Sequence, residues 1–115
     1  MTGVYQIDYL EFPSSDGIAS KTFFQRAFGW HFTGYGPTYD AIDDAGIDAG
    51  IQGDATEATA APLAIVRTTD LERAEKDVIA AGGVITRAAF DFPGGRRFHF
   101  REPGGNELAV WVARE

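Results

Sequence analysis

The chain has 115 residues, a length that suits one domain of ordinary size. Its 10 Lys and Arg against 17 Asp and Glu give a net charge of −7 spread along the sequence, which excludes the clustered cations that nucleic-acid binding needs. With no cysteine, disulfides and Cys-ligated metals are excluded and any catalysis must use oxygen or imidazole groups. No leader pattern or membrane-length apolar run is present, so we expect a cytoplasmic protein with no membrane partner.

The first half of the sequence predicts one strand, one helix and then short strands separated by glycine turns. In the first strand, period-2 alternation places Tyr9 and Glu11 on one face. Ser14, Ser15 and Asp16 are candidate caps at the start of the helix, and Gly29 is typical of its end. The expected elements are a strand over 4–12, a helix over 18–28, and strands within 30–36, 38–43 and 45–52.

The second half predicts the same order of elements after a small, polar linker over 53–61. Thr69 to Glu72 reads as a capping box, with Thr69 as the cap, and Gly82-Gly83 is expected to end the helix. The expected elements are a strand over 62–67, a helix over 71–81, and strands over 84–90, 96–101 and 107–113.

The two halves coincide after a shift of 54 residues, which superimposes Asp16 on Asp70 and Gly29 on Gly83. We therefore expect a single domain, 1–115, built from two tandem β-α-β-β-β modules over 4–52 and 62–113. Each helix precedes about three strands whose connecting turns are too short for crossovers, which indicates an α+β fold rather than a parallel α/β fold. One helix per module can cover one face of a mixed sheet, which leaves the opposite face available for a site.

Four stretches carry a resemblance to a known family: YLEFPSSD, FFQRAFGWHF, DLERAEKDVIAAGG and REPGGNELAVW. Their order and spacing resemble the vicinal oxygen chelate superfamily, which contains glyoxalase I, extradiol dioxygenases, fosfomycin-resistance enzymes and bleomycin-binding proteins. The resemblance implies two modules whose mixed sheets curl around a central cavity, commonly in a homodimer. It says less about chemistry, because this fold supports isomerases, oxygenases, transferases and non-catalytic binding proteins.

The resemblance also implies where a metal would be held, from the first and last strand of each module. The relatives use His, Glu or Gln at these positions to bind ions such as Zn, Ni, Mn or Fe. In this sequence the positions fall on Tyr9, Leu63, Ala109 and either Ala49 or Gly50. Leu, Ala and Gly have no side-chain donor, and a phenol is a poor ligand near neutral pH. We therefore expect no metal or other cofactor in the family's usual place.

Five residues are candidates for contact with a ligand: Tyr9, Glu11, His99, Ala109 and Trp111. Glu11 and His99 are also the candidate general bases, although Glu11 could instead pair with an arginine. In the strand over 96–101, His99 and two arginines alternate with phenylalanines, so that face is either exposed to solvent or a polar rim for an anion. Trp111 could be a pocket wall, core or dimer interface.

Two further residues could contribute to a displaced metal site. His31 lies between aromatic residues and is more typical of a strand histidine with one nitrogen satisfied. Asp48 is the acid of a glycine-rich segment, where a turn role is the main alternative.

Three functions stay open at this point. The first is a metal-free protein that binds a small organic molecule between the modules, as the bleomycin-binding relatives do. The second is a lyase, isomerase or dioxygenase of the superfamily, with displaced metal ligands or with Glu11 or His99 as a general base. The third is a dimeric interaction or regulatory module. The missing ligand residues favour the first, and the sequence does not name the ligand.

Overall fold

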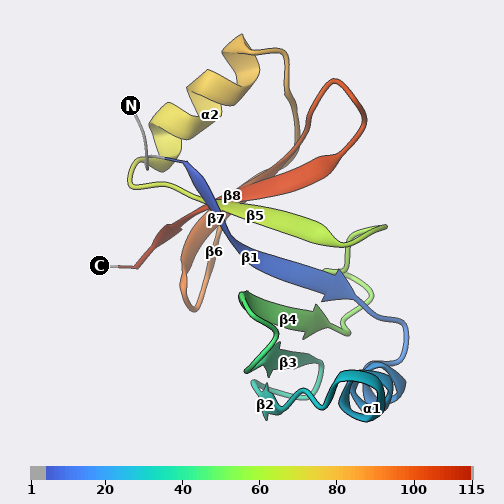
Figure 1. The fold of residues 1–115 in the computed structure, drawn as a ribbon. Helices are drawn as coiled ribbons and strands as arrows, with labels where there is room; N and C mark the ends of the chain where they lie inside the picture. The colour runs from blue at the N-terminus through green and yellow to red at the C-terminus, as the bar shows by residue number, and fades with distance from the viewer. Residues whose placement is uncertain (1–4, 115) are drawn as a thin grey trace. The chain divides into compact units, whose positions relative to one another are not determined.

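The computed structural model of the chain describes residues 5–114, so Val4 at the start of the expected first strand lies outside the described residues. The described part contains eight strands and two helices, and the α+β class is confirmed (Figure 1). In chain order the elements are β1 (Gln6–Pro13), α1 (Gly17–Phe28), β2 (Phe32–Gly34), β3 (Tyr39–Ile42), β4 (Asp48–Gln52), β5 (Leu63–Arg67), α2 (Leu71–Ala80), β6 (Val84–Phe92), β7 (Gly95–Arg101) and β8 (Glu107–Ala113).

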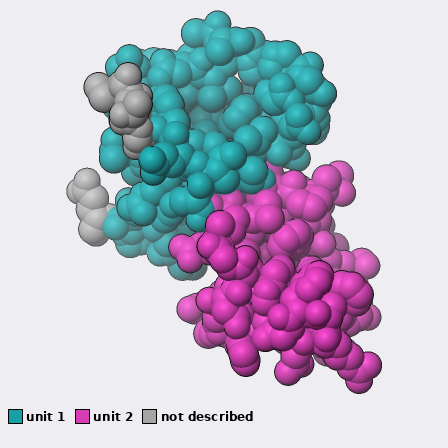
Figure 2. All heavy atoms as spheres, in the orientation of Figure 1, with its two compact units in different colours: residues 1–8, 64–115 teal, residues 9–63 magenta. Residues whose placement is uncertain are grey.

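The chain divides into two compact units, shown in different colours in Figure 2. Unit 2 comprises residues 9–63, and unit 1 comprises residues 1–8 and 64–115. Strand β1 therefore contributes its first residues to unit 1 and the rest to unit 2. Each unit contains one helix and a mixed set of strands, and each is described by itself below.

In unit 2 the strands pair in the order β2, β3, β4, β1. The β1–β4 pair is parallel and the other two pairs are antiparallel. Helix α1 covers one face, where Phe24 contacts Phe12 and Trp30 with ring centroids 5.6 and 5.2 Å apart. The core beneath it is built around three buried residues, Ile42, Ala49 and Ile51.

In unit 1 the strands pair in the order β5, β8, β7, β6. The β5–β8 pair is parallel, and the β8–β7 and β7–β6 pairs are antiparallel. Helix α2 places Ala74 against Phe98 and Val110, the buried centre of this core. Because neighbouring residues in a strand point to opposite faces, His99 and Ala109 lie on the face away from α2.

Both helices begin at an aspartate 54 residues from its counterpart. Asp16 accepts a hydrogen bond from the backbone N–H of Ala19 at 3.0 Å, and Asp70 accepts one from that of Arg73 at 3.1 Å. The predicted Thr69 cap is therefore wrong by one residue, because Asp70 occupies the N-cap position and its carboxylate accepts the free backbone N–H of Arg73.

The two helices end differently. Gly29 ends α1 in the left-handed conformation, as expected, with φ of 73°. Helix α2 ends at a right-handed Ala81, and Gly82 takes the left-handed conformation with φ of 102°. The 54-residue shift pairs Gly29 with Gly83, but Gly83 does not cap α2 as Gly29 caps α1. The reason is that α2 is two residues shorter than α1.

Glu102 closes the turn between β7 and β8. Its carboxylate accepts hydrogen bonds from the backbone N–H groups of Gly104 and Asn106 at 2.7 and 3.0 Å, and from the Asn106 side chain at 2.6 Å. Backbone bonds within residues 102–106 complete the turn. Within the described residues, neither helix is long and apolar enough to cross a membrane.

Candidate functional site

A cluster of polar side chains lies on the face of unit 2 that points away from α1. The strand register aligns Glu11 of β1 with Gly50 of β4, and Gly50 with Ala41 of β3, so these residues share a face. Tyr9 and Tyr39 lie two residues away on their strands and share it as well. The alternation predicted for Tyr9 and Glu11 is thus observed in the backbone.

Three of these side chains form one hydrogen-bonded chain. Tyr39 Oη donates to Glu11 Oε2 at 2.9 Å, and the hydroxyls of Tyr39 and Tyr9 lie 2.6 Å apart. Glu11 is only 5% exposed, and both tyrosines are half-buried. A buried carboxylate is costly unless hydrogen bonds compensate for its lost hydration, and the Tyr39 hydroxyl supplies one of them.

Gly50 makes room for the two tyrosine hydroxyls. A Cβ atom built at Gly50 would overlap both Tyr9 Oη and Tyr39 Oη. No larger side chain could therefore occupy this position of β4 while the two hydroxyls keep their places. The packing above Gly50 and the Tyr9–Tyr39–Glu11 chain are parts of one arrangement.

Tyr39 is held in its protonated form. Burial raises the pKa of Tyr39 well above its ordinary value, and the Glu11 carboxylate and the hydrogen bond with Tyr9 raise it further. The hydroxyl of Tyr39 therefore acts as a hydrogen-bond donor to Glu11 throughout the physiological pH range.

The other predicted residues lie together in unit 1. His99 pairs with Ala109 across β7 and β8, and Trp111 pairs with Arg97 two residues further on, all on the face away from α2. His99 is 2% exposed and Arg97 8% exposed. The alternative of a solvent-exposed cationic face is therefore wrong: the arginine and histidine alternation of β7 marks two buried polar positions, which sequence periodicity alone does not distinguish from an exposed face.

Aromatic rings and carboxylates surround this face of unit 1. His99 Nδ1 lies 3.6 Å from Glu107 Oε2, and the His99 and Phe90 rings are 5.8 Å apart. The Arg97 guanidinium lies 5.3 Å from the Phe90 ring centroid, within cation–π range. The indole N–H of Trp111 donates to Asp8 Oδ1 at 2.8 Å, so Trp111 is a half-buried residue with a specific polar partner.

The five predicted ligand-contacting residues thus fall into two groups. Tyr9 and Glu11 belong to unit 2, and His99, Ala109 and Trp111 belong to unit 1. Sequence reasoning missed Tyr39, which completes the first group from 28 residues away. The signal available was indirect: Glu11, in a strand flanked by apolar residues, required a hydrogen-bond partner, and Tyr39 lies in a predicted strand of the same half.

His31 and Asp48 are not part of either group. His31 is exposed and its Nδ1 lies 2.8 Å from Asp44 Oδ2, an ion pair on the surface. The hydrogen bond with Asp44 raises the pKa of His31 above its ordinary value and lowers the pKa of Asp44. Asp48 is the exposed first residue of β4, opposite Tyr9 in the register.

Comparison with known families decides the relationship that the sequence motifs indicated. The family model described as Glyoxalase/Bleomycin resistance protein/Dioxygenase superfamily matches residues 6–110. The chain belongs to this superfamily. A search among curated proteins found no relative that matches the chain.

Several solved structures share the fold at low sequence identity. Methylmalonyl-CoA epimerase from Mycobacterium tuberculosis is 12% identical, with a TM-score of 0.73 and coverage of 100% of this chain and 93% of that one. A superfamily member from Vibrio splendidus 12B01 is 13% identical, with a TM-score of 0.64 and coverage of 94% and 98%. The Mn(II)-bound glyoxalase from Novosphingobium aromaticivorans is 18% identical, with a TM-score of 0.65 and coverage of 93% of this chain and 38% of that one. These likenesses show the fold alone.

The side chains at the positions that the family resemblance assigns to a metal do not fit a metal ion. Gly50 carries no donor, and the two tyrosine hydroxyls occupy the volume above it. Leu63 and Ala109 are buried apolar residues, and the Tyr9 hydroxyl is hydrogen-bonded to Tyr39. Over residues 5–114, no three His, Asp or Glu side chains are grouped as a metal site requires.

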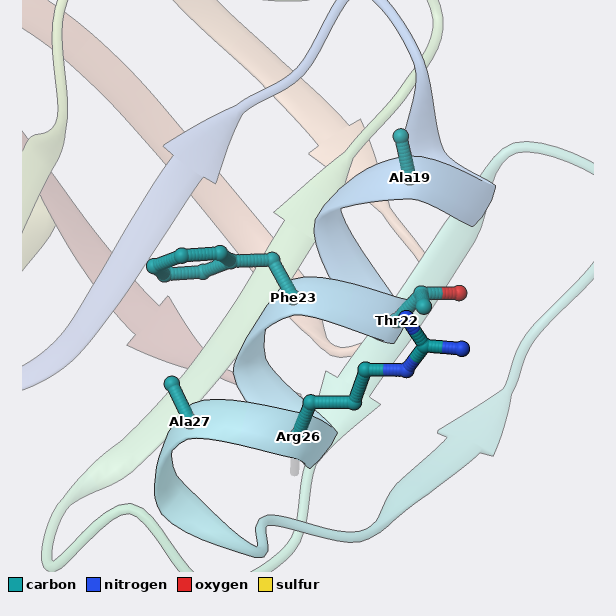
Figure 3. A pocket seen from close by; sticks show the side chains of 5 residues that line it. All are labelled: Ala19, Thr22, Phe23, Arg26 and Ala27. Carbon is teal, nitrogen blue, oxygen red and sulfur yellow. The ribbon is translucent and has the colours of Figure 1, made fainter.

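A separate open hollow of about 550 Å³ lies on the outer side of α1 (Figure 3). Phe23 stands between Ala19 and Ala27 along this side of the helix, with Thr22 and Arg26 beside it. Its lining includes none of the predicted site residues. Phe23 is 60% exposed, and no residue of α1 is buried.

Proposed function

We propose that this protein binds a small organic molecule without a metal ion, and that the ligand contacts the face of unit 2 that carries Tyr9, Tyr39 and Glu11. One observation carries the proposal: two tyrosine hydroxyls and a buried carboxylate are joined by hydrogen bonds beside Gly50, around the positions of β1 and β4 where the family resemblance implies metal ligands in relatives. His99, Ala109 and Trp111 of unit 1 remain proposed ligand contacts. A small set of polar groups among apolar and aromatic side chains is typical of ligand sites.

The test measures metal and organic content together. Purified protein is assayed for bound metal after dialysis against Zn²⁺, Ni²⁺ and Mn²⁺, and an acid extract is examined by mass spectrometry for a co-purified organic molecule. We expect less than stoichiometric metal and ligand-induced thermal stabilisation that is insensitive to EDTA. The Glu11→Gln variant should lose that stabilisation, whereas Glu72→Gln, a change at an exposed acid of α2, should keep it. Tight one-to-one metal binding would overturn the proposal.

A second candidate is metal-free proton transfer with Glu11 as the base. It is favoured by the burial of Glu11 and by the Tyr39 hydroxyl, which can hold the carboxylate in one orientation. Methylmalonyl-CoA is a reasonable first substrate to try because a structural neighbour is an epimerase of that compound. Deuterium incorporation from D₂O in the presence of EDTA, lost in Glu11→Gln, would favour this candidate over simple binding.

We also propose a twofold homodimer as the assembly, the commonest closed arrangement of soluble chains. Its support is the outer side of α1, where Phe23 is exposed although it is large and apolar. Two copies of α1 packed antiparallel would place each Phe23 against the small residues Ala19 and Ala27 of the other.

The cytoplasmic location stays a prediction.

A further inference from the structure

A hollow of about 280 Å³ lies within unit 1, between helix α2 and the strands that it covers. It is on the opposite face of these strands from His99, Ala109 and Trp111, none of which lines it. Its volume is close to the lower end of the roughly 300–1,000 Å³ of ligand sites, so it suits a molecule of fragment size. Its apolar lining comes from α2 and from β5, β7 and β8: Ala74, Val78, Ala81, Val66, Phe100 and Val110.

The apolar side chains of this hollow are not fully covered by the protein. Val66, Val78 and Phe100 pack against the core of unit 1 but are only partly buried. Hydrocarbon surface offers a water molecule no hydrogen bonds, whereas an apolar body placed there would leave solvent and cover these side chains. The lining therefore favours an apolar part in any ligand.

Two carboxylates line the same hollow, Asp77 from α2 and Glu102 from the turn after β7. Tyr5 Oη donates a hydrogen bond to Asp77 Oδ2 at 2.6 Å, and Arg73 Nε lies 3.3 Å from Asp77 Oδ1. The turn between β7 and β8 holds Glu102 through its backbone N–H groups and an asparagine amide. Both carboxylates are thus fixed in place without a ligand, which reduces the entropy cost of binding one.

Both carboxylates keep their negative charge near neutral pH. The hydrogen bond from Tyr5 lowers the pKa of Asp77, and the backbone N–H groups of the turn lower the pKa of Glu102. Arg73 offsets part of the charge of Asp77, whereas the donors to Glu102 are neutral. The last turn of α2, which the structure describes in full, has no basic residue to offset the negative end of the helix dipole. The hollow therefore combines an apolar lining with a negative rim.

We propose that this hollow binds a small organic cation, an amine of fragment size whose apolar body contacts Val78 and Phe100 and whose ammonium group lies near Asp77 and Glu102. The carboxylates already have hydrogen-bond partners, so they act through their charge, and the ammonium group keeps part of its hydration at the rim. An organic anion of the same size would be repelled by both carboxylates. This site is separate from the one proposed in unit 2 and does not depend on it.

The location is tested by NMR with phenethylammonium as the probe. The methyl signals of Val66, Val78 and Val110 should shift on titration and show nuclear Overhauser contacts to the ring of the probe. The methyl signals of Ile51, in the core of unit 2, should not change.

A pair of alanine substitutions tests whether the probe occupies the hollow. Ala81→Leu puts a larger side chain into the lining and should weaken binding about tenfold, because the probe loses the space for part of its apolar body. Ala80→Leu is the matched control, since Ala80 is exposed and lies outside the lining, and it should leave the affinity unchanged.

The charge preference is tested with phenethylammonium, phenethyl alcohol and hydrocinnamate, which share a phenylethyl body and differ in charge. We expect the ammonium probe to bind about tenfold more tightly than the carboxylate probe, with the alcohol between them and the ratio falling as salt is added. Asp77→Asn keeps an oxygen acceptor for Tyr5 but removes a charge, so it should lower this ratio about threefold. Glu72→Gln, at an exposed acid outside the lining, should leave the ratio unchanged.

Equal binding of the ammonium and carboxylate probes would overturn the proposal, as would a ratio that Asp77→Asn does not change. If no probe shifts the valine signals at millimolar concentration, the proposal is also overturned. A preference for the cation that falls in Asp77→Asn, with binding weakened in Ala81→Leu, supports it. Glu11→Gln should not affect this binding, so the function proposed for unit 2 is tested separately.

Discussion

Trp111 and Asp8 are 103 residues apart in the sequence, and the indole N–H of Trp111 donates a hydrogen bond to Asp8 Oδ1 at 2.8 Å. Arg67 joins them, with its guanidinium 5.1 Å from the Trp111 ring and one nitrogen 3.9 Å from Asp8 Oδ2. Asp8 thus connects the start of β1 to the strands β5 and β8 of unit 1. Asp8, Arg67 and Trp111 therefore form one three-residue contact within unit 1.

The Asp8→Ala variant should therefore destabilise unit 1. Loss of the indole acceptor in a partly exposed contact is expected to cost about 1 kcal/mol of unfolding free energy. Chemical denaturation followed by tryptophan emission measures the loss, and the native emission of Trp111 should also change. Asp8→Asn keeps an acceptor oxygen and should retain most of the stability; equal losses in the two variants would show that charge, not the hydrogen bond, is responsible.

Gly50→Ala should destabilise unit 2 because the added Cβ overlaps the hydroxyls of Tyr9 and Tyr39. Overpacking of this kind is expected to cost about 1–3 kcal/mol. Gly17→Ala is the matched control, since a Cβ there meets no atom within 4 Å and the position opens a helix. That control should be neutral or stabilising by up to about 1 kcal/mol, and thermal unfolding of the two variants distinguishes the expectations.

The N-caps give a direct test of where the helices begin. Asp16→Ala and Asp70→Ala should each destabilise the protein by about 1 kcal/mol, because each removes the acceptor of a backbone N–H at a helix start. Thr69→Ala should change the stability by less than about 0.5 kcal/mol. If Thr69→Ala were instead the more harmful change at α2, the cap would lie at Thr69 after all.

The His31–Asp44 pair should produce a pH-dependent contribution to stability. The hydrogen bond and charge of Asp44 raise the pKa of His31, so this contribution is present below the ordinary histidine pKa and is lost as pH rises through the raised value. The pKa of Asp44 is lowered, so its share is lost as pH falls through that lowered value. Both shares are present between about pH 4 and 6.5. In an NMR titration, Asp44→Asn should return the His31 pKa toward its ordinary value; an unchanged His31 pKa would show that the pair does not form in solution.

The dimer prediction is tested by light scattering at micromolar concentration. The unchanged chain should give twice the mass of one copy, and Phe23→Gln should shift the mass toward that of one copy because it removes the aromatic ring at the centre of the α1 hollow. Gln25→Ala, on the opposite side of the same helix, should keep the dimer. A single-copy mass for the unchanged chain contradicts the prediction.

Local patterns were enough to predict the elements of the fold. The capping residues before each helix, the glycine after α1 and the alternation of β1 are all effects of nearest neighbours, and the corresponding elements are found where they were expected, although the cap of α2 is Asp70 rather than Thr69. Contacts between residues that are far apart in the sequence could not be predicted from such local patterns. The Tyr39–Glu11 bond depends on which strand pairs with which, and the burial of His99 and Arg97 depends on what covers β7, so neither could be inferred from periodicity.

The turn that Glu102 closes affects the order in which the chain folds. Its hydrogen bonds join residues two to four apart, and the β7–β8 pairing that it supports needs only this short loop to form. Hairpins of this kind assemble within microseconds, whereas a parallel pair must first close a much longer loop. Tyr9 and Asp48 in the β1–β4 pair, and Ile65 and Ala109 in the β5–β8 pair, are each separated by roughly 40 residues. We therefore expect the hairpin to be the early nucleus of unit 1 and the parallel pairing to form after the transition state, so substitutions at Glu102 should slow folding and those in β5 should mainly accelerate unfolding.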